Sequence, residues 1–168
     1  MTAPAGGLAA GSHPAPAPGP APGAEPGPAA GPEYNKALAR RWFHEGWNLG
    51  NLAAAPEIFA PDFVLRGRTV GPQGPQRSVQ GIRSAFDDLT VTVHLQIAEG
   101  DLVATRYTAT GRHSAEYRGI PPTGRTVTVS GVQIWRVADG RAVEDWNSFD
   151  EWGLVSQIGE LRPQPFTG

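Results

Sequence analysis

The chain has 168 residues, a formal net charge of −2 and no cysteine, which excludes disulfides, thiolate nucleophiles and cysteine-ligated metals. Its basic residues are scattered, which argues against a nucleic-acid surface, and no apolar run approaches the roughly 20 residues that span a bilayer. We therefore expect a soluble protein without nucleic-acid or membrane partners.

Residues 1–32 differ in composition from the rest of the chain. They contain nine Pro, seven Gly and ten Ala, and Glu25 is their only charged side chain. Such a segment cannot bury enough apolar surface to offset its ordering entropy, so we expect a disordered, partly polyproline-II tail. It has neither the basic start nor the apolar core of a secretory signal, which favours a cytoplasmic protein. Residues 33–168 have the size of one ordinary domain.

The spacing of apolar residues in the first half of this domain is helical. Steps of three to five residues predict helices at 33–48, 51–59 and 75–88, with a short strand at 61–67 before the third. These segments are expected to supply one layer of the fold.

After Leu89 the apolar period changes from 3.6 to 2. The pattern predicts two strands joined by a glycine-containing turn in each of the segments 90–113 and 125–149. A short helix is expected at 152–158. This order predicts an α+β fold, a cone-shaped α+β barrel in which a strongly curved, antiparallel-rich sheet wraps around the N-terminal helices. Its interior would suit a small apolar ligand.

Two motifs are excluded on chemical grounds. "GIPPTGRT", residues 119–126, nearly matches a phosphate-binding loop, but Pro121 and Pro122 remove two N–H donors and a strand follows instead of a helix. His113 and Glu116 fall on opposite sides of a strand, so we expect no metal site.

The acidic stretch "RAVEDWNSFDEWGLVSQIG", residues 141–159, contains the candidate catalytic group. If the strand is extended, alternation separates two faces. One face holds Glu144, Trp146, Ser148 and Asp150, and the other holds Val143, Asp145, Asn147 and Phe149. Alternation does not decide which of the two faces is exposed to water. Asp150 is either a helix N-cap or, if Ser148 and Glu151 form a capping box instead, a free carboxylate.

From about residue 35 to 161 the chain resembles the SnoaL-like polyketide cyclases, ester cyclases of the nuclear-transport-factor-2-like superfamily. The resemblance rests on "GIPPTGR", on "WRVADGRAVEDW" and on a spaced C-terminal set. That set is Asp150, Gly153, Leu154, Gln157, Ile158 and Gly159.

The resemblance implies an enzyme of secondary metabolism and antibiotic biosynthesis that acts on an aromatic polyketide. It would close a ring by a cofactor-free intramolecular aldol condensation, and the catalytic aspartate of the family would correspond to Asp150. One base in an apolar pocket, with hydrogen-bond donors for the developing enolate, is enough for this chemistry. The expected partner is thus a small apolar or polycyclic metabolite, with neither metal nor cofactor.

The resemblance also implies a histidine fourteen residues before the aspartate, where this chain has Arg136. An arginine can donate a hydrogen bond but cannot exchange a proton near neutral pH. Arg136 therefore either assists Asp150 or pairs with it and weakens it as a base. His113 shares the strand parity of Tyr107 and is a candidate carbonyl donor, with a satisfied core histidine as the alternative.

Five further side chains are expected to contact the substrate. They are Trp146, Glu144, Tyr107, Arg66 and Trp42. Trp146 lies on the face of Asp150, where it would desolvate that carboxylate and stack on a flat substrate.

The sequence is compatible with two other functions and also bears on the oligomeric state. A non-catalytic protein could hold an apolar metabolite in the same pocket, and an epoxide hydrolase-like enzyme would need a second acid and an arginine, for which Glu144 and Arg136 are available. We expect a homodimer or higher homo-oligomer, with outward-facing Val127, Val129 and Trp135 in the contact.

Overall fold

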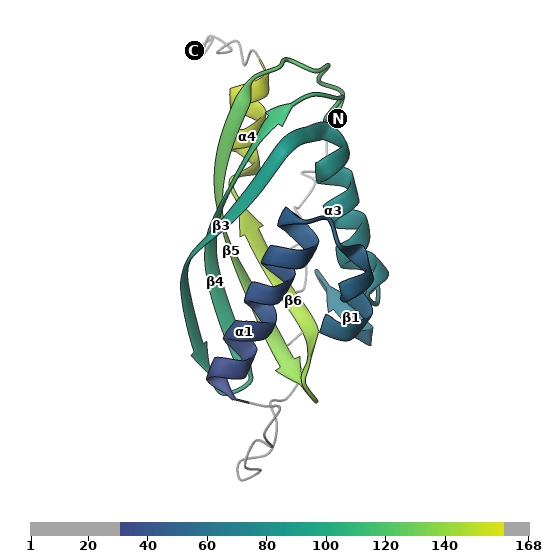
Figure 1. Ribbon diagram of the computed structural model, residues 1–168, viewed down its shortest axis with the longest axis vertical. Helices are drawn as coiled ribbons and strands as arrows, with labels where there is room; N and C mark the ends of the chain where they lie inside the picture. Colours follow the sequence, from purple (N-terminus) through teal and green to yellow (C-terminus); the bar gives the residue numbers. More distant parts are fainter. Residues whose placement is uncertain (1–30, 160–168) are drawn as a thin grey trace, which may run out of the picture.

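A long antiparallel meander forms most of the sheet (Figure 1). The computed structural model describes residues 31–159. Its six strands are β1 (Phe59–Leu65), β2 (Arg68–Thr69), β3 (Phe86–Glu99), β4 (Leu102–His113), β5 (Thr126–Ala138) and β6 (Arg141–Phe149). Their order is β2-β1-β6-β5-β4-β3, and β1 pairs with β6 in parallel while the other pairs are antiparallel. The two-residue period thus correctly predicted the meander and the α+β class.

The helices cover one face of this curved sheet. They are α1 (Pro32–Trp42), α2 (Ala55–Ile58), α3 (Gln73–Ala85) and α4 (Glu151–Ile158), with shorter turns at Phe43–Asn48 and Leu52–Ala54. Figure 1 shows α1 crossing the sheet, α3 beside it, and α4 at the opposite end from the start of α1. Among the residues described, the sheet is open, with β2 and β3 at its edges.

The first predicted helix changes its geometry partway along. Regular α-helix ends at Trp42, and residues Phe43–Asn48 form a wider π-helical turn. Gly46 lies in this turn, where an added Cβ would come 2.6 Å from the Trp42 ring, so the close approach requires glycine. Such turns are frequent at functional sites, and this one carries Phe43 and Trp47.

The third helix ends three residues earlier than its periodicity predicted. It stops at Ala85, and Phe86 already pairs with His113 as the first residue of β3. Phe86 is buried, so strand pairing and burial override the helical spacing at this boundary.

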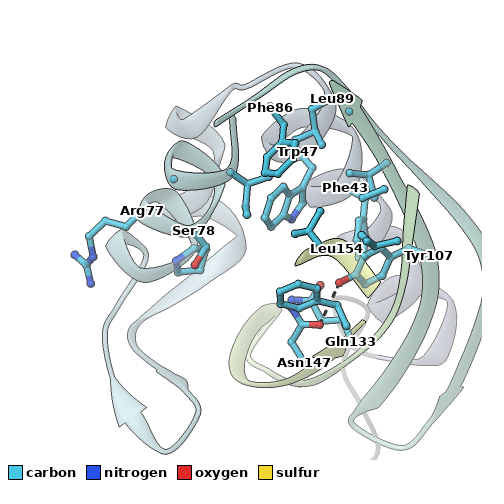
Figure 2. Close-up of a pocket in the computed structure, with 18 of the residues that line it drawn as sticks. Phe43, Trp47, Arg77, Ser78, Phe86, Leu89, Tyr107, Gln133, Asn147 and Leu154 are labelled. Atoms are coloured by element: carbon cyan, nitrogen blue, oxygen red, sulfur yellow. Dashed lines mark hydrogen bonds between the residues drawn. The ribbon is translucent and has the colours of Figure 1, made fainter. Parts of the chain in front are cut away.

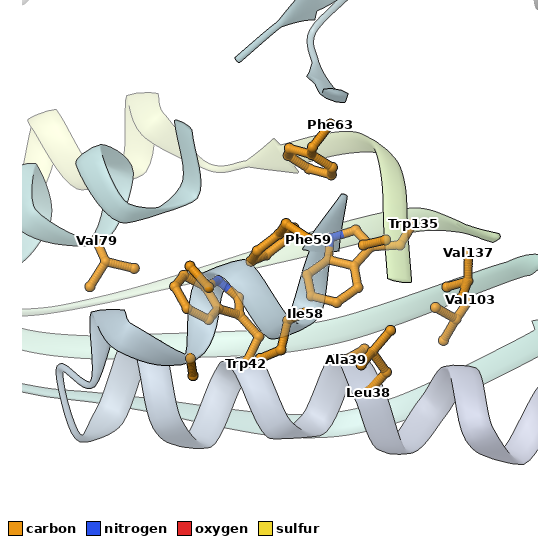
Figure 3. Close-up of a cluster of buried hydrophobic side chains, with 13 residues drawn as sticks. Leu38, Ala39, Trp42, Ile58, Phe59, Phe63, Val79, Val103, Trp135 and Val137 are labelled. Atoms are coloured by element: carbon orange, nitrogen blue, oxygen red, sulfur yellow. The ribbon is translucent and has the colours of Figure 1, made fainter. Parts of the chain in front are cut away.

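An aromatic cluster between the helices and the sheet forms the centre of the larger core (Figure 3). Ring centroids of Trp42 and Phe59 lie 5.0 Å apart, and those of Phe59 and Trp135 lie 5.1 Å apart, all in edge-on arrangements. Trp135 is only 1% exposed, and Val127 and Val129 belong to a second apolar cluster. The expectation that these three residues face outward was therefore wrong.

The structure covers only part of the chain to which two expectations apply, namely the disordered N-terminal tail and the absence of a membrane-spanning segment. Residues 1–30, almost all of the predicted tail, lie outside the described residues, as do residues 160–168. Within residues 31–159, every helix is too short or too polar to cross a membrane.

Candidate active site

A cavity of about 530 Å³ lies between the concave face of the sheet and the helices (Figure 2). Most of its wall is apolar. The aromatic part consists of Trp42, Phe43, Trp47, Phe59, Phe86, Tyr107, Tyr117 and Phe149. A space of this size and lining is suited to a small polycyclic ligand.

Four polar side chains enter this wall from β4, β5 and β6. Gln133 Nε2 donates a hydrogen bond of 2.7 Å to Asp145 Oδ2, and Tyr107 donates one of 3.2 Å to Asn147 Oδ1. Figure 2 shows the Tyr107–Asn147 bond and places Gln133 beside it. Asp145 Oδ1 is buried and has no hydrogen-bond partner among the residues described.

The environment of Asp145 disfavours its charged form. The side chain is 4% exposed, and burial raises the pKa of Asp145 to about 7. The bond from Gln133 and the charge of Arg66 pull this pKa in the opposite direction, but they do not cancel the effect of burial. A carboxyl group with a pKa near neutrality is suited to accept and return a proton.

A β-bulge turns Asp145 toward the cavity. Val137 pairs with Ala142, whereas the preceding Arg136 pairs with Glu144, so Val143 is the extra residue. A regular hairpin would place Glu144 opposite the inward-facing Trp135. The bulge shifts the register by one, so Asp145 pairs with Trp135 and faces inward.

Tyr107 reaches its position because its cross-strand neighbour has no side chain. Tyr107 pairs with Gly131, where an added Cβ would lie 2.6 Å from the phenol oxygen. Burial raises the pKa of Tyr107, although the bond to Asn147 opposes this effect. The phenol therefore stays a hydrogen-bond donor at neutral pH.

Asp150, the aspartate selected from the sequence, does not line this cavity. It is exposed, and its Oδ1 accepts a 2.7 Å hydrogen bond from the backbone N–H of Gly153 as the N-cap of α4. The two alternatives for Asp150 are thus resolved in favour of the cap. It also borders a shallow depression on the outside of the sheet with Ser148 and Arg106.

Removing this cap should cost stability. Asp150→Ala is expected to lower the free energy of unfolding by about 1 kcal/mol, because a helix N–H loses its acceptor. Urea denaturation would measure this loss, with Ser148→Ala, the rejected cap, as a matched control that should change little. A loss in Ser148→Ala but not in Asp150→Ala would contradict the assignment.

Arg136, Glu144 and Trp146 lie on the outer face of the sheet. Arg136 Nη1 lies 2.8 Å from a carboxylate oxygen of Asp101, and its Nε lies 3.6 Å from one of Glu144. Its guanidinium also stacks 5.7 Å from the centre of the Trp146 ring. Arg136 thus pairs with Asp101 and Glu144 and neither assists Asp150 nor pairs with it, and none of these three outer-face residues lines the cavity.

His113 faces inward, as its parity predicted, but it serves as a core residue. It is fully buried against Phe86, with ring centroids 5.3 Å apart. Its Nδ1 lies 3.1 Å from Thr123 Oγ1 and 3.3 Å from the Thr123 backbone N–H. The imidazole thus holds the segment between β4 and β5 and does not line the cavity.

Three of the predicted contact residues do line the cavity, namely Trp42, Tyr107 and Arg66. Arg66 follows Leu65, which pairs with Asp145 across β1 and β6. Asp145, Gln133 and Asn147 line the cavity but were not among the site residues predicted from the sequence. The signal that the sequence did contain was the shared parity of Asp145, Asn147 and Phe149, all of which line the cavity.

The fold and the site together define a class of protein. Its members are α+β proteins in which a curved sheet and helices enclose an apolar cavity with a buried acid. The model of the SnoaL-like polyketide cyclases matches residues 37–158. The chain belongs to this family.

Individual relatives agree with this membership. Over 111 residues the chain is 28% identical to nogalonic acid methyl ester cyclase of Streptomyces nogalater, covering 64% of this chain and 81% of that protein. Over 128 residues it is 24% identical to aklanonic acid methyl ester cyclase DnrD of Streptomyces peucetius, covering 72% and 88%. Among solved structures, IdmH from Streptomyces antibioticus is 34% identical with a TM-score of 0.67, covering 74% of this chain and 98% of that one.

Proposed function

We propose that this protein is a polyketide cyclase-type enzyme of antibiotic biosynthesis that closes a ring by intramolecular aldol condensation, with Asp145 as its general acid/base. Membership of the cyclase family supports the reaction class. The observation that carries the residue assignment is the buried carboxyl group of Asp145 at the cavity wall. One of its oxygens accepts a hydrogen bond from Gln133, and the other has no partner within residues 31–159.

The proposed reaction requires two proton transfers at one carboxyl group. Asp145 accepts a proton from a carbon that lies beside carbonyl groups, and the resulting carbanion attacks a ketone of the same molecule. A carbon–carbon bond forms, the ketone oxygen becomes an alkoxide, and the proton returns from Asp145 to that oxygen. The pKa of about 7 suits both transfers near neutral pH, because acid and base forms are both populated.

Asn147 is the proposed donor to the developing oxyanion. Its Oδ1 accepts the Tyr107 hydroxyl, which leaves the amide N–H groups of Asn147 free to face the ligand. A positioned neutral donor in an apolar site stabilises an enolate or alkoxide more than it stabilises the neutral carbonyl. Flat aromatic walls such as Phe43, Trp47 and Phe86 would hold a polycyclic substrate in place.

The test is turnover of candidate polyketides. The purified protein should be incubated, without added cofactor, with nogalonic and aklanonic acid methyl esters and with the corresponding free acids. The ring closure proposed here is the aldol addition step without loss of water, so the expected product is an isomer of unchanged mass with one more ring. Saturable binding of these compounds with no product from any of them would favour a non-catalytic binding protein.

The epoxide hydrolase-like alternative loses the residue pair on which it depended. Glu144 and Arg136 interact with each other on the outer face and do not converge on Asp145. We therefore do not propose that activity.

A homodimer contact is proposed on the outer face of the sheet. Four side chains form one row across β3, β4, β5 and β6, in the pairing order Ile97, Ala104, Ile134 and Trp146. Ile97 is 63% exposed and Trp146 is 40% exposed. Arg136 and Glu144 adjoin this row, so the face carries both charge signs and is self-complementary under a twofold rotation.

Ile97→Glu should therefore disrupt the dimer. A buried, unpaired carboxylate within a contact is unfavourable, so a shift from dimer to monomer is expected in light scattering after size exclusion. Thr90→Glu, at an exposed position of the same strand outside the row, is the matched control. A wild-type protein that is already monomeric would refute this proposal.

A further inference from the structure

Two arginines at the cavity occupy turn positions that do not favour arginine. Arg66 and Gly67 form the two-residue turn between β1 and β2, with φ values of 50° and 73°. Arg118 and Gly119 form a second such turn between Tyr117 and Ile120, with φ values of 50° and 79°. Turns of this type favour Asn, Asp or Gly at the first position, because other side chains are strained at positive φ.

A third turn of the same kind shows the ordinary choice. Asp139 and Gly140 join β5 to β6 with φ values of 50° and 73°, and neither lines the cavity. The chain therefore uses the favoured residue type where the turn lies away from the cavity. Turn formation therefore does not explain the arginine at position 66.

Arg66 is positioned to bind a group on a ligand. It is exposed, lines the cavity and has no hydrogen bond or ion pair within residues 31–159. Arg77 of α3 also lines the cavity without such a partner, and Figure 2 shows its side chain extending away from the aromatic cluster. Arg118 differs from both, because it is paired with Glu151.

The cavity wall contains two acidic groups, Glu116 and Asp145. Glu116 belongs to the segment after β4. This segment lies at the C-terminal end of α3, because the N–H of Ser114 donates a hydrogen bond to the carbonyl of Ala85. Arg77 precedes Ala85 by eight residues, which is about 12 Å along a helix. Asp145, the other acid, is uncharged in part near neutral pH because of its burial. Arg66 and Arg77 therefore bring two positive charges to the cavity wall, and the acid beside Arg66 is only partly ionised.

We propose that Arg66, assisted by Arg77, binds a carboxylate on the substrate, so that the ligand of this protein is a polycyclic aromatic acid with a free carboxylate. A guanidinium group forms charge-assisted, bidentate hydrogen bonds with a carboxylate, and esterification removes both the charge and the bidentate geometry. This inference rests on the cavity being the substrate site, as proposed above, but it does not depend on ring closure.

The experiment compares binding of anthraquinone-2-carboxylate with binding of its methyl ester by calorimetry. The wild-type protein should bind the acid about tenfold more tightly at low ionic strength, and added salt should weaken only the acid. Arg66→Asn should abolish this preference and melt no lower than wild type, because asparagine is favoured in the turn. Arg68→Gln, two residues away on the same hairpin but outside the cavity wall, should keep the preference.

Equal affinity for the acid and the ester, no binding of the acid, or a preference that survives Arg66→Asn would each overturn the inference. A partial loss in Arg77→Gln would support the assisting role. The result of this binding experiment can be distinguished from the result of the turnover experiment. An acid preference without any ring-closed product would refute the cyclase proposal alone, and turnover of neutral esters without an acid preference would refute this inference alone.

Discussion

Asp145→Asn is expected to lower kcat by about a hundredfold or more while leaving ligand affinity within a few-fold of wild type. The substitution keeps the shape of the side chain and its bond to Gln133, but it removes the group that accepts the proton. Turnover and binding must both be measured, because a collapsed cavity would lower both.

The matched control is Asp150→Asn, which changes the same residue type five positions later on the outside of the cavity. It should retain turnover close to that of wild type, since an asparagine still caps a helix. A large loss in Asp150→Asn with wild-type turnover in Asp145→Asn would restore the aspartate chosen from the sequence. In the wild-type protein, kcat/KM should rise with pH through about 7, because only the deprotonated carboxylate is a base.

The second large effect is a gain in stability from the same substitution at alkaline pH. The unfolded chain releases the proton of Asp145 near pH 4, whereas the folded protein keeps it until about pH 7. Between these values the folded state binds more protons, so the contribution of this group to stability falls as pH rises. Above pH 7 the folded protein carries a buried charge at a cost on the order of 4 kcal/mol.

Asparagine carries no charge, so Asp145→Asn should raise the free energy of unfolding by about 4 kcal/mol at pH 8 and by only about 1.5 kcal/mol at pH 5. Urea denaturation at the two pH values measures the difference between variant and wild type. An equal change at both values would mean that the effect comes from packing and not from the charge. Together with the loss of turnover, the expected gain would identify Asp145 as a residue that is retained for chemistry at the expense of stability.

Local patterns in the sequence were sufficient for the architecture. The change of apolar period after Leu89 predicted where helices give way to a meander of strands, because side chains alternate along a strand and recur every 3.6 residues along a helix. Strand parity also grouped Asp145 with Asn147 and Phe149 correctly. The C-terminal motifs indicated the family, whose model matches residues 37–158.

The identity of the candidate base could not be derived from these patterns. Alternation assigns residues to two faces, but only the packing of helices decides which face becomes the cavity wall, and the inward direction of Trp135 follows from its contact with Phe59.

The sequence by itself therefore determined the order of elements, the α+β class and the sets of residues that share a face. The tertiary structure decided which set is functional. The bulge at Val143 rotates Asp145 inward and Glu144 outward, and the start of α4 engages Asp150 as its cap. Both depend on how a strand pairs with its neighbour or joins a helix in space, and a one-residue shift in pairing exchanges the two faces without changing any local pattern.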